Sequence, residues 1–158
     1  MATTTAQHAG ASGAIAGTHF SWEEVVRNSG YTTLPSGLQT GATQHAKNME
    51  KLRAELNKRR KVHELPETGL NVLSWARSPQ HNIDVGGAKH SRHLMCDACD
   101  IAKEEILRIC PWPGGAADFD QAAETIFANG GVGLYKPGNR HVDSRGYHAR
   151  WTSWTPGG

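Results

Sequence analysis

The fold is decided by the stretch VGLYKPGNRHVDS, residues 132–144. Both ends of the stretch are rich in strand-favouring residues, and the four residues between them, Lys136-Pro137-Gly138-Asn139, are a turn signal. The pattern predicts an antiparallel β-hairpin. Its two strands are expected over Val132–Tyr135 and Arg140–Ser144.

The second strand of the hairpin carries two side chains that could do chemistry. Alternation along a strand puts His141 and Asp143 on one face and turns Val142 to the other. A second such pair, His93 and Asp100, lies upstream, seven residues apart, and can converge if a turn separates the two residues. Zinc binds imidazole nitrogen and carboxylate oxygen. From spacing alone a structural alternative stays open, in which His93 caps a loop and Asp100 pairs with a lysine.

The remainder of the chain predicts several helices. Ser21 and Glu24 form a capping-box pattern that predicts a short helix over Trp22–Asn28. Apolar residues at three- and four-residue spacing predict an amphipathic helix from Thr43 to about Arg60. The other predicted elements are a strand over Leu70–Ala76, a long polar loop over Arg77–Arg92, a strand over Ala98–Ile101, a helix over Lys103–Ile109, and a helix through Phe119 and Phe127 capped by Asp118.

These elements predict an α+β fold in which helices pack on a small, largely antiparallel sheet. A chain of 158 residues fits one compact domain. Residues 1–17 are small and polar and are expected to form a flexible arm, which leaves residues 18–158 as a single domain. The N-terminus resembles no signal peptide, and no stretch has the length of a membrane span. We expect synthesis in the cytoplasm and no membrane insertion.

Charge and cysteine content narrow the function classes. The formal net charge of +2 is mild and scattered, which argues against a nucleic-acid groove, and the basic run over residues 58–61 suits a helix end. Three cysteines cannot form a complete disulfide framework, so reduced thiols are expected. The Cys96-x-x-Cys99 pair leaves a redox or structural-zinc reading open as an alternative.

Most other polar and aromatic candidates have ordinary interpretations. Tryptophans are expected to pack in the core or at its rim instead of stacking on sugars. The tryptophans concerned are Trp75, Trp151 and Trp154. Several histidines and aspartates are expected to face solvent, namely His8, His19, His45, His63, His148, Asp84 and Asp97.

Three motifs in order resemble the peptidase M15 family, the D-Ala-D-Ala carboxypeptidase and L-Ala-D-Glu endopeptidase group. SRHLMCDACD, residues 91–100, is similar to the family signature Ser-x-His-x-x-Gly-x-Ala-x-Asp, with Cys96 where the family usually has glycine. SWARSPQHNIDVGG, residues 74–87, is similar to the family's GYRSP…N…VGG stretch. GVGLY and HVD, within residues 131–143, are similar to its GVGxY…HVD ending. If glycine serves there for its backbone angles, Cys96 strains the loop.

The resemblance implies a hedgehog-like or D-Ala-D-Ala carboxypeptidase-like fold and a role for each matching residue. Arg77 matches an arginine that holds the substrate carbonyl or carboxylate, and Ser91 matches a serine near the metal that contributes to substrate binding. Asp143 is the carboxylate available as general base. An inverted assignment, with Asp143 as ligand and His141 as base, stays open. The implied ligands of one zinc ion are His93, Asp100 and His141.

The activity that the resemblance implies is zinc-dependent hydrolysis of a peptide bond in the stem peptides of bacterial peptidoglycan. The enzyme would be a carboxypeptidase or an endopeptidase, expected to be a monomer. It would act on the cell wall after release, as bacteriophage lysins do. The alternative is a catalytically inactive zinc-binding relative that serves as a binding or structural module.

Overall fold

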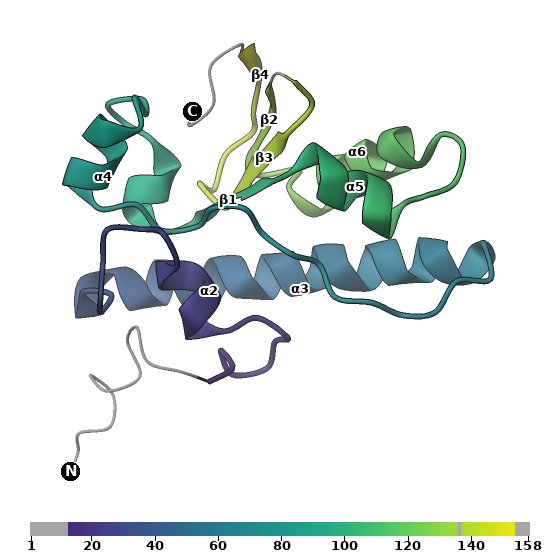
Figure 1. Cartoon of the computed structure of the whole chain (residues 1–158), viewed down its shortest axis with the longest axis horizontal. Coiled ribbons are helices and arrows are strands. Elements are labelled where there is room, and N and C mark those ends of the chain that lie inside the picture. The colour runs from purple at the N-terminus through teal and green to yellow at the C-terminus, as the bar shows by residue number, and fades with distance from the viewer. Residues whose placement is uncertain (1–12, 136, 154–158) are drawn as a thin grey trace.

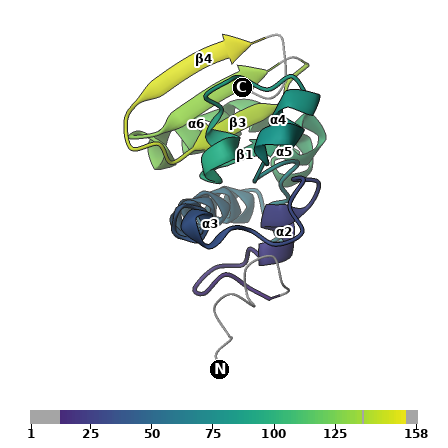
Figure 2. The same ribbon diagram turned by 90° about the vertical axis from the view of Figure 1, so that its left-hand side faces the viewer.

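The computed structural model describes residues 13–135 and 137–153. One long helix, α3 (Gln39–Val62), runs along the molecule, and a four-stranded sheet lies on one side of it (Figure 1). Seen along α3, the sheet covers the helix while the short helix α2 (Trp22–Val26) lies beside it (Figure 2). This arrangement confirms the predicted α+β class.

The sheet has the strand order β1-β3-β2-β4. Strand β3 pairs antiparallel with both β1 and β2, so the predicted hairpin is confirmed. Strand β4 pairs parallel with β2 and was not predicted, which makes the sheet mixed. The strands are β1 (Ala98–Ile101), β2 (Gly131–Tyr135), β3 (Arg140–Asp143) and β4 (Ala149–Ser153).

The strand register places four residues in one row across the sheet. Asp100 pairs with His141, His141 with Gly133, and Gly133 with Trp151. Residues directly opposite in a sheet share a face, so the chemistry-bearing side chains of β1 and β3 point the same way. Gly133 leaves room for the indole, because a Cβ there would lie 2.6 Å from a Trp151 ring atom.

The two N-terminal helices form where the sequence predicts them, but their bounds differ from the predicted ones. The capping box of Ser21 and Glu24 is present. Helix α2 stops before the predicted Asn28, which has a left-handed φ of 54°. Helix α3 extends beyond both ends of the predicted Thr43–Arg60 helix, because the 3₁₀ turn η1 (Ser36–Leu38) leads directly into it.

The helices after β1 pack beside the sheet. Helix α5 (Lys103–Ile109) is as predicted. Helix α6 (Gly115–Ile126) begins before Asp118, so the predicted cap is wrong. The Asp118 carboxylate accepts a hydrogen bond from Trp112 Nε1 at 2.7 Å, while left-handed Gly114 holds the N-cap position.

Two predictions for residues 70–92 are wrong. The segment predicted as a strand over Leu70–Ala76 forms only an isolated bridge between Ser74 and Asp100, because its other backbone groups bond to separate elements. The predicted loop over Arg77–Arg92 contains α4 (Pro79–Asp84) and the start of the 3₁₀ turn η2 (Arg92–Met95). Ser78 caps α4 and proline occupies its first turn, a start signal that the sequence displays.

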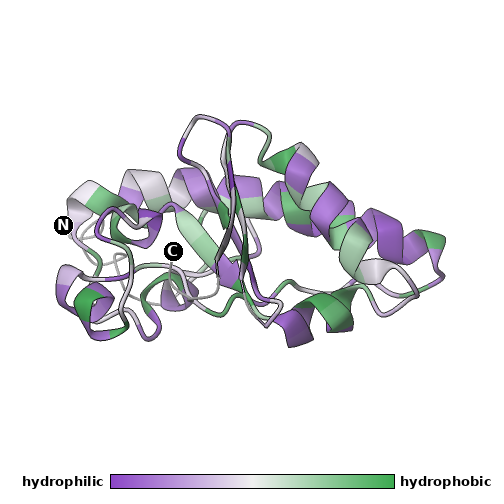
Figure 3. Cartoon of the chain, turned by 90° about the horizontal axis from the view of Figure 1, so that it is seen from above, coloured by the Kyte–Doolittle hydropathy of each residue, from purple (hydrophilic) through white to green (hydrophobic). Residues whose placement is uncertain are grey.

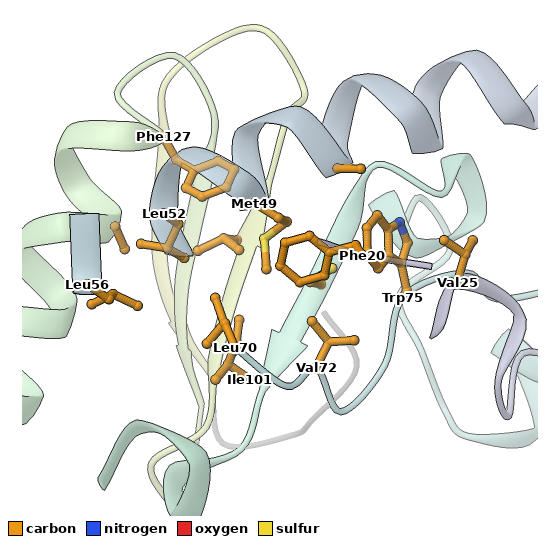
Figure 4. Packing of buried hydrophobic residues seen from close by; sticks show 14 of the residues in the cluster. Phe20, Val25, Met49, Leu52, Leu56, Leu70, Val72, Trp75, Ile101 and Phe127 are labelled. Carbon is orange, nitrogen blue, oxygen red and sulfur yellow. The ribbon is translucent and has the colours of Figure 1, made fainter. Parts of the chain in front are cut away.

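The core lies between α3, β1 and the segment over residues 70–76 (Figure 4). Trp75 is fully buried, packs edge-on against Phe20 and donates its Nε1 proton to the carbonyl of Cys96. Burial of each such large apolar side chain stabilises the fold by roughly 1.5–3 kcal/mol. Ile15, which the sequence places in the arm, is also buried in this core, and residues 1–12 lie outside the described part.

The longest helix carries hydrophilic residues along its whole length (Figure 3). Among the described residues, no helix is both long enough and apolar enough to cross a membrane. Three basic residues occupy the last turn of α3, as predicted for a helix end, where a positive charge suits the helix dipole.

Candidate metal centre

Three side chains predicted as metal ligands come together in the structure. His93 comes from η2, Asp100 from β1 and His141 from β3. Each offers one ligand atom, and these atoms all lie within 4.8 Å of one another. Both histidines are fully buried, and Asp100 is 6% exposed. A cation at this point would meet two imidazoles and one carboxylate, a donor set that suits zinc.

The hydrogen bonds of His93 leave one ring nitrogen facing the other two side chains. Its Nδ1 lies 2.6 Å from the carbonyl oxygen of Trp75, so Nδ1 carries the proton and donates it. Nε2 is buried and has no hydrogen-bond partner among the described residues, although it lies 3.2 Å from Asp100 Oδ1. Ser91 holds the turn, because its Oγ accepts from the backbone amide of His93. Nε2 therefore presents a lone pair suited to a metal ion.

Asp100 lies between the two histidines and an arginine. Its Oδ1 is 3.2 Å from His93 Nε2 and 3.0 Å from His141 Nδ1, and its Oδ2 is 3.7 Å from Arg77 Nη2. Burial raises the pKa of Asp100, but the charges of the two histidines lower it by more than burial raises it. The net pKa is therefore well below its usual range. The carboxylate is therefore ionised and available to a cation.

His141 lies between two carboxylates. Its Nδ1 faces Asp100, and its Nε2 is 2.8 Å from Asp143 Oδ2. Burial lowers the pKa of His141, but hydrogen bonds to Asp100 and Asp143 raise it above the ordinary value. When Nε2 donates its proton to Asp143, the Nδ1 lone pair points to the side where His93 and Asp100 lie. A histidine whose outer nitrogen donates to a carboxylate is a recurrent arrangement of metal ligands.

The Asp143 carboxylate is surrounded by donors. Oδ1 accepts from Gly131 N at 2.9 Å and from the backbone and Nε of Arg145 at 3.2 and 2.8 Å. Oδ2 accepts from His141 Nε2 and from Arg145 Nη2 at 2.6 Å. Burial raises the pKa of Asp143, but Arg145 and His141 outweigh it and hold the pKa far below its usual range. A carboxylate has about four lone-pair positions, so these donors leave little capacity to accept another proton.

The geometry bears on which residue of β3 is the third ligand. The group whose donor atoms all approach within 4.8 Å contains His141, and Asp143 is not a member of it among the described residues. Asp143 instead contacts the ring nitrogen of His141 that faces away from Asp100. The arrangement favours His141 over the inverted assignment.

Arg77 lies beside the three side chains and at a cleft. Its guanidinium is 3% exposed, and its Nη1 donates to Asn82 Oδ1 at 3.0 Å. The cleft has a volume of about 240 Å³, and both Arg77 and Asp100 line it. A fixed cation and an ionised carboxylate at the base of a cleft can hold a polar substrate group. The other lining residues are Asn28, Leu73, Ser74, His81 and Val85.

Some of the surface expectations are wrong. His45 is fully buried in α3, where its Nδ1 lies 2.7 Å from Ser144 Oγ and burial lowers its pKa to about 3. It occupies the buried stripe of the helix, which overrides the usual exposure of histidine. Asp97 is also buried, because it pairs with Arg92. Those predicted correctly are His19, His63, His148 and Asp84, whereas His8 lies outside the described residues.

Cys96 and Cys99 lie in the interior of the fold. Cys96 and Cys99 are buried free thiols. Burial raises the pKa of Cys96 to about 12 and that of Cys99 well above its ordinary value, which disfavours the thiolate that redox chemistry and metal binding require. Cys96 adopts a left-handed φ of 61°, so the position does require the backbone angles that glycine favours.

Two residues beside this site, Arg145 and Tyr135, were not predicted from the sequence to take part in it. Arg145 holds Asp143 and packs its guanidinium 4.9 Å from the Trp151 ring centroid. Trp151 in turn packs 5.1 Å from the His141 ring, and Tyr135 packs 5.9 Å from it. The position of Arg145 two residues after Asp143 was a usable signal for the first. No local pattern distinguishes Tyr135 from a core tyrosine. Of the other tryptophans, Trp75 is in the core and Trp154 lies outside the described residues.

The sequence profile of the family described as Peptidase M15 matches residues 18–111, more than half of the chain. The matched part contains η2 and β1, and it ends before β3. No curated protein matches the chain. The matched site residues are Arg77, Ser91, His93 and Asp100.

Proposed function

The chain belongs to the peptidase M15 family, and we propose from this premise that it is a zinc peptidase that cleaves stem peptides of bacterial peptidoglycan. The family assignment makes the chain a metallopeptidase. The zinc ion, the substrate and the role in cell-wall lysis are parts of the proposal. The observation that supports it most is the convergence of three buried ligand atoms within 4.8 Å, one of them the unpartnered Nε2 of His93.

We assign the three ligand positions to His93, Asp100 and His141. Two buried imidazoles and one carboxylate suit a single zinc ion, and three protein ligands leave a coordination position for water or substrate. Zinc held in this way supplies a Lewis acid for the scissile carbonyl and lowers the pKa of a bound water toward neutrality. The His93 Nδ1–H bond to the Trp75 carbonyl and the His141 Nε2–H bond to Asp143 fix both rings for this task.

Asp143 is assigned an orienting role here. Its hydrogen bonds with Arg145, Gly131 and His141 support this role over the general-base role expected from the sequence. A carboxylate with a strongly depressed pKa is a weak proton acceptor near neutral pH. Its function is to keep the His141 proton on Nε2, so that the Nδ1 lone pair faces Asp100.

Arg77 is assigned to substrate binding. Its buried guanidinium lines the cleft beside Asp100 and is held at Nη1 by Asn82. From that position it can attract a carboxylate or a carbonyl oxygen of the peptide, and it supports the charge that develops on that oxygen. Ser91 acts on the same site by fixing the turn that carries His93.

The reaction is hydrolysis of one amide bond. The oxygen of a water molecule adds to the carbonyl carbon, the C–N bond breaks, and both water protons end on the leaving nitrogen. The products are a carboxylate and an ammonium group. Cleavage at a terminal D-alanine and cleavage inside the stem peptide obey the same balance, so the bond is identified from the products.

The proposal is tested on purified peptidoglycan. Protein stripped with a chelator and reloaded with one equivalent of zinc should release new amino groups, and mass spectrometry of the fragments identifies the bond. Chelated protein should release none. Zinc-loaded protein that binds the metal at these residues but releases no amine would favour the inactive binding module. A wall-lysis role, as in bacteriophage lysins, further predicts loss of turbidity of intact cell-wall suspensions.

A further inference from the structure

Tyr135 is a buried tyrosine whose hydroxyl has no acceptor among the described residues. The residue is 2% exposed, and its hydroxyl oxygen has no hydrogen-bond partner among the described residues. The Trp151 indole next to it can only donate through its N–H, so it does not accept the hydroxyl hydrogen. The hydroxyl hydrogen of Tyr135 is therefore available to an acceptor that the described residues do not supply.

The strand places Tyr135 next to the metal centre. Gly131, Gly133 and Tyr135 lie at alternate positions of β2 and share one face of the sheet. Gly133 pairs with His141 in the row of ligands, so Tyr135 is one step further along the same face. Its ring centroid is 5.9 Å from that of His141. Asp143 flanks the ligand row on one side, and Tyr135 flanks it on the other.

A phenol is a neutral group that can donate a hydrogen bond near pH 7. Asp100, which pairs with His141 across the sheet, lines the cleft together with Arg77. A phenylalanine would fill the same space without placing a hydroxyl there.

We propose that Tyr135 is a catalytic residue whose hydroxyl donates a hydrogen bond to the scissile carbonyl oxygen as that oxygen becomes negatively charged. The proposal rests on the proposed peptidase function and adds a second donor to Arg77. A neutral donor in a buried site stabilises a developing oxyanion more than the uncharged carbonyl, because the site excludes water. The effect of Tyr135 therefore falls on kcat more than on KM.

The test compares Tyr135→Phe with Tyr31→Phe, a control at a partly buried tyrosine that packs against the hydrophobic core. Three quantities are measured: zinc bound per chain, the thermal midpoint of the metal-free protein, and kcat and KM on a stem peptide. For Tyr135→Phe we expect unchanged zinc, a midpoint no lower than wild type, and a kcat lower by about 10²-fold. The control should match wild type in kcat.

Binding of a phosphinic stem-peptide analogue, whose tetrahedral oxygens resemble the transition state, gives a reading independent of turnover. Tyr135→Phe should weaken this binding by roughly the same factor as kcat. Unchanged kcat and unchanged analogue binding would overturn the inference while leaving the proposed function intact. Loss of zinc or a lower midpoint together with lost activity would assign Tyr135 a structural role and also overturn it. If the wild-type protein cleaves no stem peptide, the proposed function fails. Equal binding of the analogue by wild type and Tyr135→Phe would contradict the inference about Tyr135, whatever the outcome for cleavage.

Discussion

Among the described residues, five hydrogen bonds converge on the Asp143 carboxylate from three residues. If Asp143 orients His141, Asp143→Ala should weaken zinc binding by about 10–100-fold, as loss of such an outer carboxylate does in other metal sites. Competition with a zinc chelator measures this. Asp97→Asn is a matched control, because Asp97 is also buried and paired with an arginine but contacts none of the three ligands.

The same variant separates two roles for Asp143. A general base would leave zinc affinity at the wild-type level and lower only the rate. Zinc affinity unchanged in Asp143→Ala, with activity lost, would therefore return Asp143 to the proton-accepting role expected from the sequence.

Single residues also show what the sequence could and could not predict. The residues that carry the ligands were predictable because they fall within motifs that resemble those of a family. His45 was predicted on the surface from its residue type, yet it lies in the buried stripe of α3 together with Ala42, Ala46 and Met49. Tyr135 could not be singled out, because only the folded sheet shows that its hydroxyl has no acceptor within the described part of the chain.

At the scale of elements, the glycines of β2 make room for the site. A Cβ at Gly131 would lie 2.3 Å from Asp143 Oδ2, so Gly131→Ala must displace that carboxylate. We expect a loss of roughly 1–3 kcal/mol in unfolding free energy, the usual range for overpacking, together with weaker zinc binding. Urea denaturation and a zinc titration measure the two effects.

The control for Gly131→Ala is Gly69→Ala, where an added Cβ would meet nothing within 4 Å. This control should change the unfolding free energy by less than about 1 kcal/mol. Equal stability and equal zinc affinity for both glycine variants would mean that β2 does not constrain Asp143.

Helix α5 is joined to the preceding segment by Glu105, which accepts from Arg108 Nε at 2.7 Å and from Asn71 N at 2.8 Å. Burial raises the pKa of Glu105, but the hydrogen bonds from Arg108 and Asn71 outweigh this effect, so the net pKa lies below its ordinary value. A carboxyl group whose pKa is lower in the folded state than in the unfolded state stabilises the fold. This stabilisation is complete at a pH above the unfolded-state pKa, and it is lost as the pH falls through the folded-state pKa.

Glu105→Gln should therefore lower stability by about 1–3 kcal/mol at pH 7, the usual cost of losing a charged hydrogen-bond partner. Below pH 4.5 the difference from wild type should shrink. Thermal unfolding of both proteins from pH 3 to pH 7, the range over which a carboxyl group titrates, measures the difference. A difference that stays constant over this range would show that the charge of Glu105 contributes nothing.

Elements with strong local signals were predictable and those set by tertiary partners were not. The hairpin of β2 and β3, the capping box of α2 and the periodic stripe of α3 are encoded within short windows. The segment over residues 70–76 has strand-favouring residues. However, its backbone groups bond to α2, to η2 and to Asp100, so the segment pairs with β1 at one bridge only. The parallel pairing of β4 with β2 is non-local, and no short window of sequence encodes it.

At the scale of the whole molecule, the metal centre joins η2, β1 and β3, which are separated in sequence. Zinc that binds only the folded chain should stabilise it by about 2.7 kcal/mol at 100 times the dissociation constant. For a domain of this size we expect a rise of roughly 5–10 °C in the thermal midpoint. His141→Ala should abolish most of this rise, whereas His63→Ala, at an exposed histidine, should keep it.

If His93, Asp100 and His141 together hold a catalytic zinc ion, a zinc titration of metal-free protein in the presence of purified peptidoglycan should show it. The rate of amine release should rise in proportion to added zinc, reach a plateau at one zinc per chain, and stay near zero in His93→Ala, Asp100→Ala and His141→Ala. Amine release that needs no zinc, or that persists in His141→Ala at the wild-type zinc dependence, would contradict the assignment of this site as the catalytic centre.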